Sequence, residues 1–268
     1  MRDLAYTLYE NTVQNPPNSL RFFDAVFLAH RGRRARTLRE DFCGTFQVAA
    51  AWVASRPDRA ALALDHDLEP LAWGRRRHRD RLPPDARRRL SVLRRNVVGV
   101  TRPAVEIQAA ENYSYFALHD RALLLRYLRA ARASLTADGM LLLDTGGGPG
   151  FVETRSDRRR FAMPAGVKPR GRYSYIWDQR AFDPVTRRGD YRIHFRLPGG
   201  RLLRNAFCYD WRLWTIPEMR DALLEAGFRD TAVWWEQADV DGDGNGTYAP
   251  AERADNDWSW NAYVCGLR

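Results

Sequence analysis

The chain has 268 residues, of which 45% are hydrophobic and 28% charged, and this balance suits one sizeable domain with a buried core. No apolar run reaches the length of a membrane span, and the N-terminal stretch lacks the apolar core and cleavage site of a secretory signal. The three cysteines are widely spaced and form no C-x-x-C pair. We therefore expect a cytoplasmic protein with free thiols and no membrane partner.

The net charge of +10 raises the question of nucleic-acid binding. Lys168 is the only lysine, so arginine supplies nearly all of the positive charge, which suggests GC-rich codon usage. The arginine clusters at 75–77, 87–89 and 158–160 are scattered and are not interleaved with stacking aromatics. We interpret them as solvated helix faces, which argues against a nucleic-acid partner and leaves attraction to an acidic substrate open.

Strand and helix patterns alternate through the first half of the chain. Apolar runs predict strands at 35–40, 59–65, 90–97, 104–112 and 139–145. Amphipathic segments predict helices at 46–56, 68–80 and 121–135. Strands that alternate with helices of this length imply a parallel sheet with right-handed crossovers.

The pattern changes after the glycine-rich stretch 146–150. Aromatic alternation predicts three antiparallel strands, separated by turns, at 172–184, 190–200 and 201–214. We interpret them as an inserted sheet that could cap a substrate. A capping box from Thr215 to Glu218 then opens a helix at 217–226, and strands follow at 231–237 and 258–267.

These elements predict an α/β fold. We expect a Rossmann-like, seven-stranded, mostly parallel sheet whose last strand is antiparallel, with a small antiparallel sheet inserted. The corresponding parts are 1–150, an N-terminal cap segment with the cofactor-binding half; 151–212, the inserted substrate cap; and 213–268, which completes the main sheet.

Polar and glycine residues follow the strands of the predicted sheet. The stretch 38–46, LREDFCGTF, passes from a strand through Gly44 into a helix whose N-terminus offers free N–H groups to a ligand. Asp65 ends the next strand, where dinucleotide-type folds hold a ribose diol. Asn96 and the stretch 110–113 end the third and fourth strands. Open α/β sheets bind ligands at these strand ends, so we expect the site there.

The motif at 40–45, Glu-Asp-Phe-Cys-Gly-Thr, resembles the first motif of class I S-adenosylmethionine-dependent methyltransferases, in the variety found in glycine N-methyltransferase-like enzymes. Segments 63–67, 111–115 and 209–228 are similar to later motifs of that group, in the same order. The resemblance runs from about Tyr6 to the end of the chain. It departs from the family pattern at three positions, where the family has small residues: Phe42, Phe46 and Glu111.

The resemblance implies S-adenosylmethionine as cofactor. Its implied contacts come from residues at the strand ends, which are Glu40, Gly44, Asp65, His66, Asn96, Val97 and Ala110. Asp65 would hold the ribose hydroxyls, and the backbone of Ala110 would lie near the sulfonium. We add Arg39 or Tyr9 as a partner of the methionine carboxylate.

Methyl transfer from a sulfonium is an in-line displacement, for which the protein supplies alignment and excludes water. Such a site needs an aromatic pocket with a few polar anchors. The candidates for binding the methyl acceptor are Asn112, Tyr113, Tyr115, Tyr175, Trp177, Trp211, Trp214 and Glu236. The candidates for a catalytic group are Asn112, Tyr115 and His194.

The resemblance favours a methyltransferase that acts on a small molecule, and N-methylation of an amine or amino acid fits best. O- or C-methylation of an aromatic metabolite is the alternative within the class. From other classes, an RNA methyltransferase, a basic binding protein and a non-catalytic relative with Phe42 and Phe46 closing the loop stay open. A homo-oligomer is compatible with all of these.

Residues 241–252 match the calcium-loop pattern D-x-[DN]-x-[DN]-G-x5-E. An EF-hand needs a helix on each side of this loop, whereas the flanking segments read as strands. Ala249 and Pro250 also do not suit the second half of the loop. We therefore predict a polar hairpin and no metal site.

Overall fold

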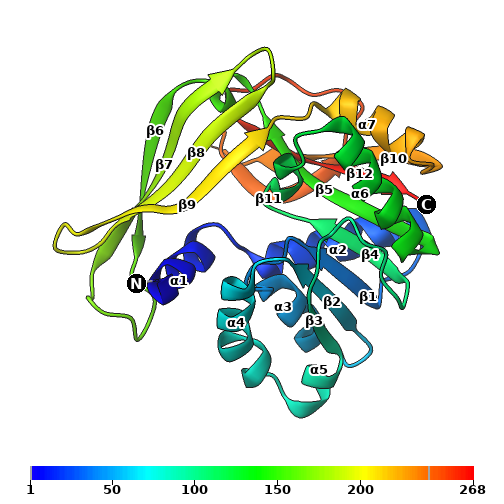
Figure 1. Cartoon of the computed structure of the whole chain (residues 1–268), viewed down its shortest axis with the longest axis horizontal. Helices are drawn as coiled ribbons and strands as arrows, with labels where there is room; N and C mark the ends of the chain where they lie inside the picture. The colour runs from blue at the N-terminus through cyan, green and yellow to red at the C-terminus, as the bar shows by residue number, and fades with distance from the viewer. Residues whose placement is uncertain (1, 241) are drawn as a thin grey trace.

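The computed structural model describes residues 2–240 and 242–268 (Figure 1). An eight-stranded sheet forms the centre of the molecule. Its strands, in spatial order, are β11 (Gly244–Pro250), β10 (Asp230–Ala238), β12 (Trp260–Leu267), β5 (Leu135–Gly147), β4 (Val105–Ala110), β1 (Thr37–Asp41), β2 (Ala60–Asp65) and β3 (Leu90–Arg94).

The main sheet is mostly parallel, as predicted. Strands β1 to β5 run in one direction, and β12, the last strand, is antiparallel to both β5 and β10. The expected number of seven strands is one too low, because the polar hairpin predicted near the C-terminus pairs as β11 with β10. The hairpin is confirmed within the described residues, while Asp241 lies outside them.

Helices cover both faces of the main sheet. One face carries α2 (Pro16–Arg31), α3 (Gln47–Ser55), α4 (Leu68–Arg77) and α5 (Pro84–Arg88). The other carries α6 (Arg121–Ser134), α7 (Ile216–Glu225) and the short 3₁₀ helix η2 (Ser114–Ala117). Two further 3₁₀ turns are η1 (Arg79–Arg81) and η3 (Pro149–Phe151).

Local chemistry explains where these helices begin. The Asn15 side chain accepts a hydrogen bond from the Asn18 N–H at the start of α2, and Pro16 occupies the first turn. The predicted capping box of α7 is present, with Thr215 and Glu218 each bonding the other's backbone. In the described part of the chain, no helix is both long and apolar enough to cross a membrane.

A separate antiparallel sheet contains four strands rather than the three predicted. They are β6 (Arg155–Ala162), β7 (Arg172–Asp183), β8 (Arg188–Arg196) and β9 (Leu202–Arg212). The sequence did not indicate β6, because this edge strand is mostly charged and lacks apolar alternation. The helix α1 (Arg2–Thr12) packs against the apolar face of this sheet and lies between it and the main sheet (Figure 1).

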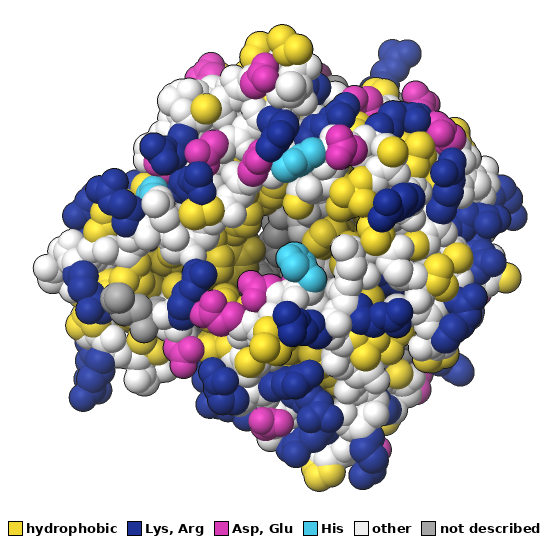
Figure 2. All heavy atoms as spheres, viewed as in Figure 1, with side chains coloured by type: hydrophobic (Ala, Val, Ile, Leu, Met, Phe, Trp, Pro, Cys, Tyr) yellow, Lys and Arg dark blue, Asp and Glu magenta, His cyan; other side chains and the backbone are white. Residues whose placement is uncertain are grey.

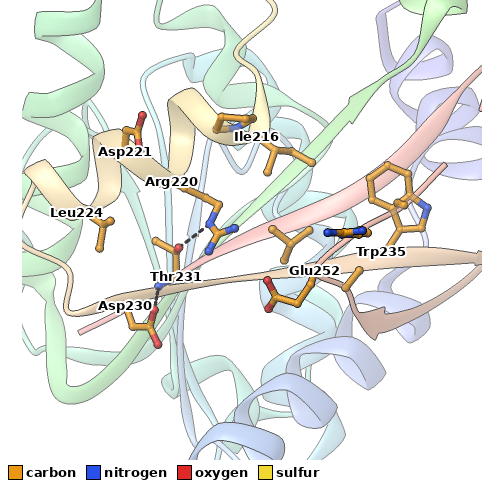
Figure 3. A pocket seen from close by; sticks show the side chains of 13 residues that line it. Ile216, Arg220, Asp221, Leu224, Asp230, Thr231, Trp235 and Glu252 are labelled. Carbon is orange, nitrogen blue, oxygen red and sulfur yellow. Dashed lines mark hydrogen bonds between the residues drawn. The ribbon is translucent and has the colours of Figure 1, made fainter. Parts of the chain in front are cut away.

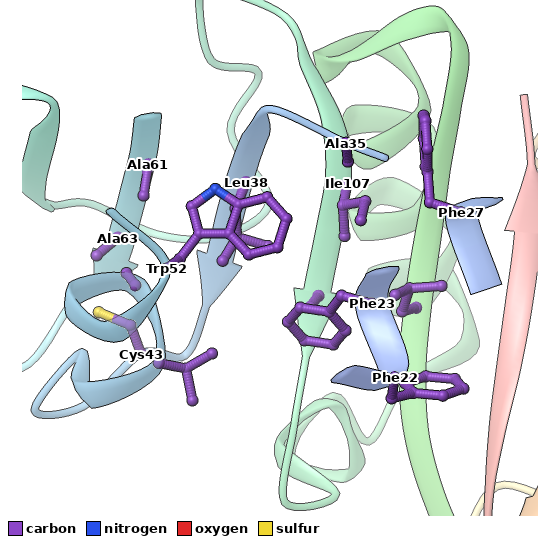
Figure 4. Packing of buried hydrophobic residues seen from close by; sticks show 14 of the residues in the cluster. Phe22, Phe23, Phe27, Ala35, Leu38, Cys43, Trp52, Ala61, Ala63 and Ile107 are labelled. Carbon is purple, nitrogen blue, oxygen red and sulfur yellow. The ribbon is translucent and has the colours of Figure 1, made fainter. Parts of the chain in front are cut away.

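The core beneath α2 and α3 combines large rings from the helices with small side chains from the strands. Phe23 of α2 and Trp52 of α3 are fully buried. They pack over a sheet surface that includes Ala61, Ala63 and Ile107 (Figure 4). The alanines of β2 let the helices approach the sheet closely, and the rings fill the space that is left.

Replacing Phe23 with alanine should lower the free energy of unfolding by about 3–5 kcal/mol, because the substitution leaves a cavity in a fully buried position. Leu28 lies on the same helix but is 46% exposed, so Leu28→Ala should change it by less than about 1 kcal/mol. Urea unfolding of both variants measures the difference. Equal losses would contradict the packing described here.

Candidate active site

The loop after β1 has an unusual backbone. Phe42, Gly44 and Phe46 all adopt left-handed conformations, with φ of 52°, 51° and 49°. The Gly44 N–H donates a 2.8 Å hydrogen bond to Oδ2 of Asp65 at the end of β2. Two non-glycine residues with positive φ indicate strain that the surrounding packing must offset. The end of β2 thus holds the loop in place.

The two phenylalanines of this loop differ in where their rings lie. Phe46 is fully buried, and its ring packs edge-on against His78 and next to Gly74 of α4. A Cβ on Gly74 would lie 2.3 Å from the Thr45 carbonyl oxygen, so only glycine allows α4 to approach the loop this closely. Phe42 faces Tyr127 at a ring distance of 5.9 Å. The Phe46 ring therefore points away from the strand ends and leaves the space beside Gly44 open.

A cavity of about 500 Å³ opens at the C-terminal ends of β1, β2 and β4; we call it the strand-end cavity. A hollow is visible in the centre of the face drawn in Figure 2, with hydrophobic side chains along one side. Several predicted site residues line the cavity: Tyr9, Gly44, Asp65, His66, Asn112 and Trp211. The sequence analysis therefore predicted the edge of the sheet where this cavity lies and some of the residues that line it.

The carboxylate of Asp65 organises one end of the strand-end cavity. Besides the bond from Gly44, its Oδ1 accepts a 2.9 Å hydrogen bond from the Asp67 N–H. Asp67 in turn caps α4 by accepting from the Glu69 N–H. His66 is largely exposed beside them. This end presents acceptor oxygens for hydroxyl groups, next to an open surface for a planar ring.

The helix α1 covers the strand-end cavity and is attached to its floor by Glu10. This buried carboxylate accepts a 2.6 Å hydrogen bond from the Thr45 hydroxyl of the loop and lies 2.6 Å from His78 Nε2 on the far side. Tyr6 and Tyr9 of the same helix line the cavity. The sequence analysis missed Glu10, because a lone glutamate in an N-terminal helix looks like a surface residue.

A second cavity, of about 220 Å³, adjoins the first, and we call it the acidic chamber. The two cavities share Gln14, Glu111 and Asn112. The chamber is lined by the carboxylates of Glu111, Asp144 and Glu236 and by the rings of Phe22, Tyr113, Tyr248 and Tyr263. No arginine, lysine or histidine lines it, and the described part of the chain contains no ion pair to any of these three carboxylates.

Uncharged donors hold the chamber carboxylates in position. Glu111 accepts from the Ser19 hydroxyl at 3.0 Å and from the Tyr263 hydroxyl at 2.8 Å. Glu236 accepts from the Gly246 N–H at 2.8 Å and from the Asn261 amide at 2.6 Å. Asp144 Oδ2 accepts from the Asn112 N–H at 2.7 Å. The carboxylates are hydrogen-bonded but have no positive partner.

This arrangement changes how the carboxyls ionise. Burial raises the pKa of Asp144 well above its ordinary value, and the nearby charges of Glu111 and Glu236 raise it further. Burial also raises the pKa of Glu111. Carboxyls in this setting favour the protonated form when no cation balances them, and a cation would replace that proton. The described residues contain no group of three or more His, Cys, Asp or Glu side chains that could hold a metal ion.

No family model matches the sequence, and no curated protein does. Solved structures are similar over nearly the whole chain. The sugar N-methyltransferase KedS8 from Streptoalloteichus is 18% identical, with a TM-score of 0.65 and coverage of 97% of this chain and 91% of that one. The amino pentose methyltransferase CalS10 from Micromonospora echinaspora is 16% identical, with a TM-score of 0.65 and coverage of 96% and 95%. A S-adenosylmethionine-dependent methyltransferase from Clostridium acetobutylicum is 12% identical, with a TM-score of 0.67 and coverage of 97% and 96%.

The chain has the methyltransferase fold. The α/β prediction, with a mostly parallel sheet and a small inserted antiparallel sheet, is thereby confirmed. At these low identities the similarity concerns the fold.

Arg39 and Glu40, which the sequence analysis expects to contact the cofactor, bond to other groups of the chain instead. Arg39 is fully buried and lines neither cavity; its guanidinium donates to Asp41 Oδ1 and to the Val97 carbonyl, both at 2.7 Å. Glu40 is also buried, and its Oε2 accepts from the Ala49 N–H at 2.7 Å, where it fixes the start of α3. The expectation that Arg39 meets a ligand carboxylate is corrected, because the strand pleat turns this side chain under β1 toward α6.

Three other predicted cofactor residues also lie outside the lining of the strand-end cavity. Asn96 is exposed, and its side chain accepts from the Val98 N–H. Val97 and Ala110 are buried in the core on the α6 side of the sheet. The structure therefore provides no contact between their side chains and the cavity.

The predicted acceptor residues divide into two groups. Asn112, Tyr113 and Glu236 line the acidic chamber, and Trp211 lines the strand-end cavity. The others lie in neither lining, and these are Tyr115, Tyr175, Trp177 and Trp214. The ring of Trp177 packs 5.9 Å from that of Trp211, so it supports the cavity wall from behind.

His194 and Tyr115 are poorly placed for catalysis. His194 alternates with Ile193, which faces α1, so its ring lies on the other face of the inserted sheet. There it contacts Asp178 at 3.3 Å and accepts from the Asn205 N–H. Tyr115 is fully buried, and burial raises its pKa. Both predictions are corrected, since neither side chain lines either cavity.

A further cavity of about 460 Å³ lies between α7, β10 and residues 251–254 (Figure 3). Arg220 donates to the Thr231 hydroxyl at 2.9 Å, and the Thr231 N–H donates to Asp230. This cavity shares no lining residue with the strand-end cavity or the acidic chamber.

Replacing Arg39 with methionine should lower the free energy of unfolding by about 3–5 kcal/mol, because Asp41 would keep a buried charge without its partner. Arg36→Met, at an exposed position before the same strand, should cost less than about 1 kcal/mol. Urea unfolding gives both values. A stable Arg39 variant that has lost affinity for S-adenosylhomocysteine would instead restore Arg39 as a cofactor contact.

The raised pKa of Asp144 predicts how pH affects stability. Between the ordinary carboxyl pKa of 3.8 and its raised value, the folded chain holds a proton that the unfolded chain has lost. Stability from this group therefore falls as the pH rises through that range, by about 1.4 kcal/mol for each tenfold change in proton affinity. Asp144→Asn should become more stable relative to the wild type as the pH rises above the ordinary carboxyl pKa, as measured by urea unfolding. A difference that does not vary with pH would contradict this assignment.

Proposed function

We propose that the chain is a S-adenosylmethionine-dependent methyltransferase that N-methylates an amine on a small molecule. One observation carries the proposal: the strand-end cavity meets the acidic chamber at Glu111 and Asn112. The first cavity offers groups suited to a nucleoside, and the second offers negative charge without a counter-ion. A cofactor and a cationic acceptor would meet at their junction.

The strand-end cavity suits the cofactor in size and chemistry. Its volume of about 500 Å³ lies in the range of small-molecule sites. Asp65 would accept hydrogen bonds from the ribose hydroxyls, and the backbone at Gly44 would lie along the methionine portion. Tyr9 and Tyr6 of α1 would cover the ligand and exclude water. When bound, the cofactor supplies an electrophilic methyl group on a sulfonium.

The acidic chamber favours an amine over the alternatives. Three carboxylates and several aromatic rings attract an ammonium group through charge and through cation–π contacts. A carboxylate on the acceptor would find no basic partner there, so a simple amine or amino sugar fits better than an amino acid. O- or C-methylation of an aromatic metabolite would leave the buried carboxylates uncompensated.

The similar structures support the same choice. Their names describe one as a sugar N-methyltransferase and another as an amino pentose methyltransferase, and both have the same fold over nearly their full length. The alternative RNA methyltransferase would require basic side chains around the mouth. Arg2 is the only arginine in the lining of the strand-end cavity, which also contains Asp65, Asp67 and Glu111. The charge thus favours a small, cationic acceptor.

Calorimetric titration with S-adenosylhomocysteine tests the cofactor. We expect micromolar binding to the wild type and a loss of about 10- to 100-fold in affinity for Asp65→Ala, which removes the acceptor oxygens and the anchor of Gly44. Asp85→Ala, at an exposed position on α5, is the matched control and should bind as the wild type does.

The outcome separates the open alternatives. Binding that depends on Asp65 would justify a screen of amines for transfer of a labelled methyl group. Failure of the wild type to bind would leave the non-catalytic relative as the better description, despite the withdrawn ring of Phe46.

A further inference from the structure

We propose that Asp144 accepts the proton of the acceptor's ammonium group, while Glu111 and Glu236 hold that group on either side. This inference rests on the proposed function, since it names the proton acceptor within the same site. It assigns a catalytic role to a residue within β5 that lies outside the motifs that carry the resemblance.

The strand order places Asp144 between the other two carboxylates. In the pairing of β4 with β5, Ala110 lies opposite Leu143, so Asp144 is level with Glu111 just beyond β4. On the other side, Tyr263 of β12 lies opposite Asp144, and β12 separates β5 from β10, which carries Glu236. Along this edge of the sheet, Asp144 therefore lies between Glu111 and Glu236.

Among the described residues, the ionisable side chains that line the chamber with Asp144 are all acids. Glu111 approaches from the end of β4, Glu236 from β10, Tyr248 from β11 and Tyr263 from β12, and Tyr113 follows β4; these are the groups whose charges act on Asp144 or line the chamber with it. Three adjacent carboxylates without a counter-ion retain a proton or bind a cation. The central carboxyl has two acidic neighbours, whereas each outer one has side-chain donors of its own.

The three carboxyls differ in their hydrogen-bond donors and therefore in the roles that we assign to them. Donors from Ser19 and Tyr263 stabilise the ionised form of Glu111, and Glu236 accepts from the Asn261 amide and the Gly246 N–H. Asp144 has backbone donors only, and its pKa is raised well above its ordinary value by burial and by its two acidic neighbours. The proton therefore goes to Asp144.

The reaction balances as follows. A bound ammonium, R–NH₃⁺, first replaces the proton of the Asp144 carboxyl, and that proton leaves to solvent. The ammonium then passes one proton to the Asp144 carboxylate and becomes R–NH₂. Its nitrogen lone pair forms the new C–N bond as the C–S bond of the sulfonium breaks, which yields R–NH₂⁺–CH₃, a neutral thioether and a protonated Asp144.

The exchange of a proton for a cation can be measured without methyl transfer. Protein saturated with S-adenosylhomocysteine is titrated with n-butylammonium at pH 7.5, in phosphate and in Tris, which differ in their enthalpy of ionisation. We expect binding with release of protons on amine binding, and binding at least tenfold tighter than that of n-butanol, the neutral analogue.

Asp144→Asn keeps an oxygen that can accept from the Asn112 N–H, so the fold should survive, and unchanged affinity for S-adenosylhomocysteine confirms that it does. In this variant the amine should bind at least tenfold more weakly and release little proton. Glu236→Gln should weaken binding but keep the proton release, because Asp144 is still present. Glu252→Gln, an exposed carboxylate outside the chamber, is the control and should behave as the wild type does.

Amine binding without proton release in the wild type would overturn the assignment of the proton to Asp144. Equal binding of butylammonium and butanol, or no binding of either, would overturn the ammonium site itself. Proton release that persists in Asp144→Asn would move the role to another carboxyl. The proposed function fails separately, in the absence of S-adenosylhomocysteine binding before any amine is added.

Discussion

The register of the parallel strands determines where this protein can act. Strands β1, β2, β4 and β5 run the same way, so the residues that follow them meet at one edge of the main sheet. The bond from Gly44 to Asp65 joins two of these ends and holds the strained loop between them. Both cavities, the cover provided by α1 and the approach of the inserted sheet depend on this common edge.

The distribution of charge matters more than its total. The chain carries a net charge of +10, yet none of its basic side chains lines the acidic chamber. Arginine instead occupies exposed surfaces or, as with Arg39, compensates a buried carboxylate within the core. Leaving Glu111, Asp144 and Glu236 without positive partners costs stability, and a site that binds a cation explains why the chain tolerates that cost. A cation bound there, as we propose, would stabilise this region of the folded chain.

The inserted sheet and α1 complete a site that the main sheet only begins. Tyr9 and Phe207 pack with their rings 4.6 Å apart, so the helix and β9 form one cover over the strand-end cavity. Glu10 ties this cover to the loop through Thr45 and to α4 through His78. The cover and the floor of the cavity are thereby linked by a buried contact.

The sequence by itself determined the α/β class, most of the strands and the residues that follow them, because hydrophobic period and capping are local properties. Gly44, Asp65 and Asn112 could be predicted for that reason. Asp144 could have been predicted in the same way, because it directly follows the apolar run at 140–143. Only the tertiary structure decided that Arg39 turns into the core, that His194 lies on the outer face of its sheet and that Glu236 joins Glu111. Those outcomes depend on the strand pleat and on pairings between distant segments, which no local pattern contains.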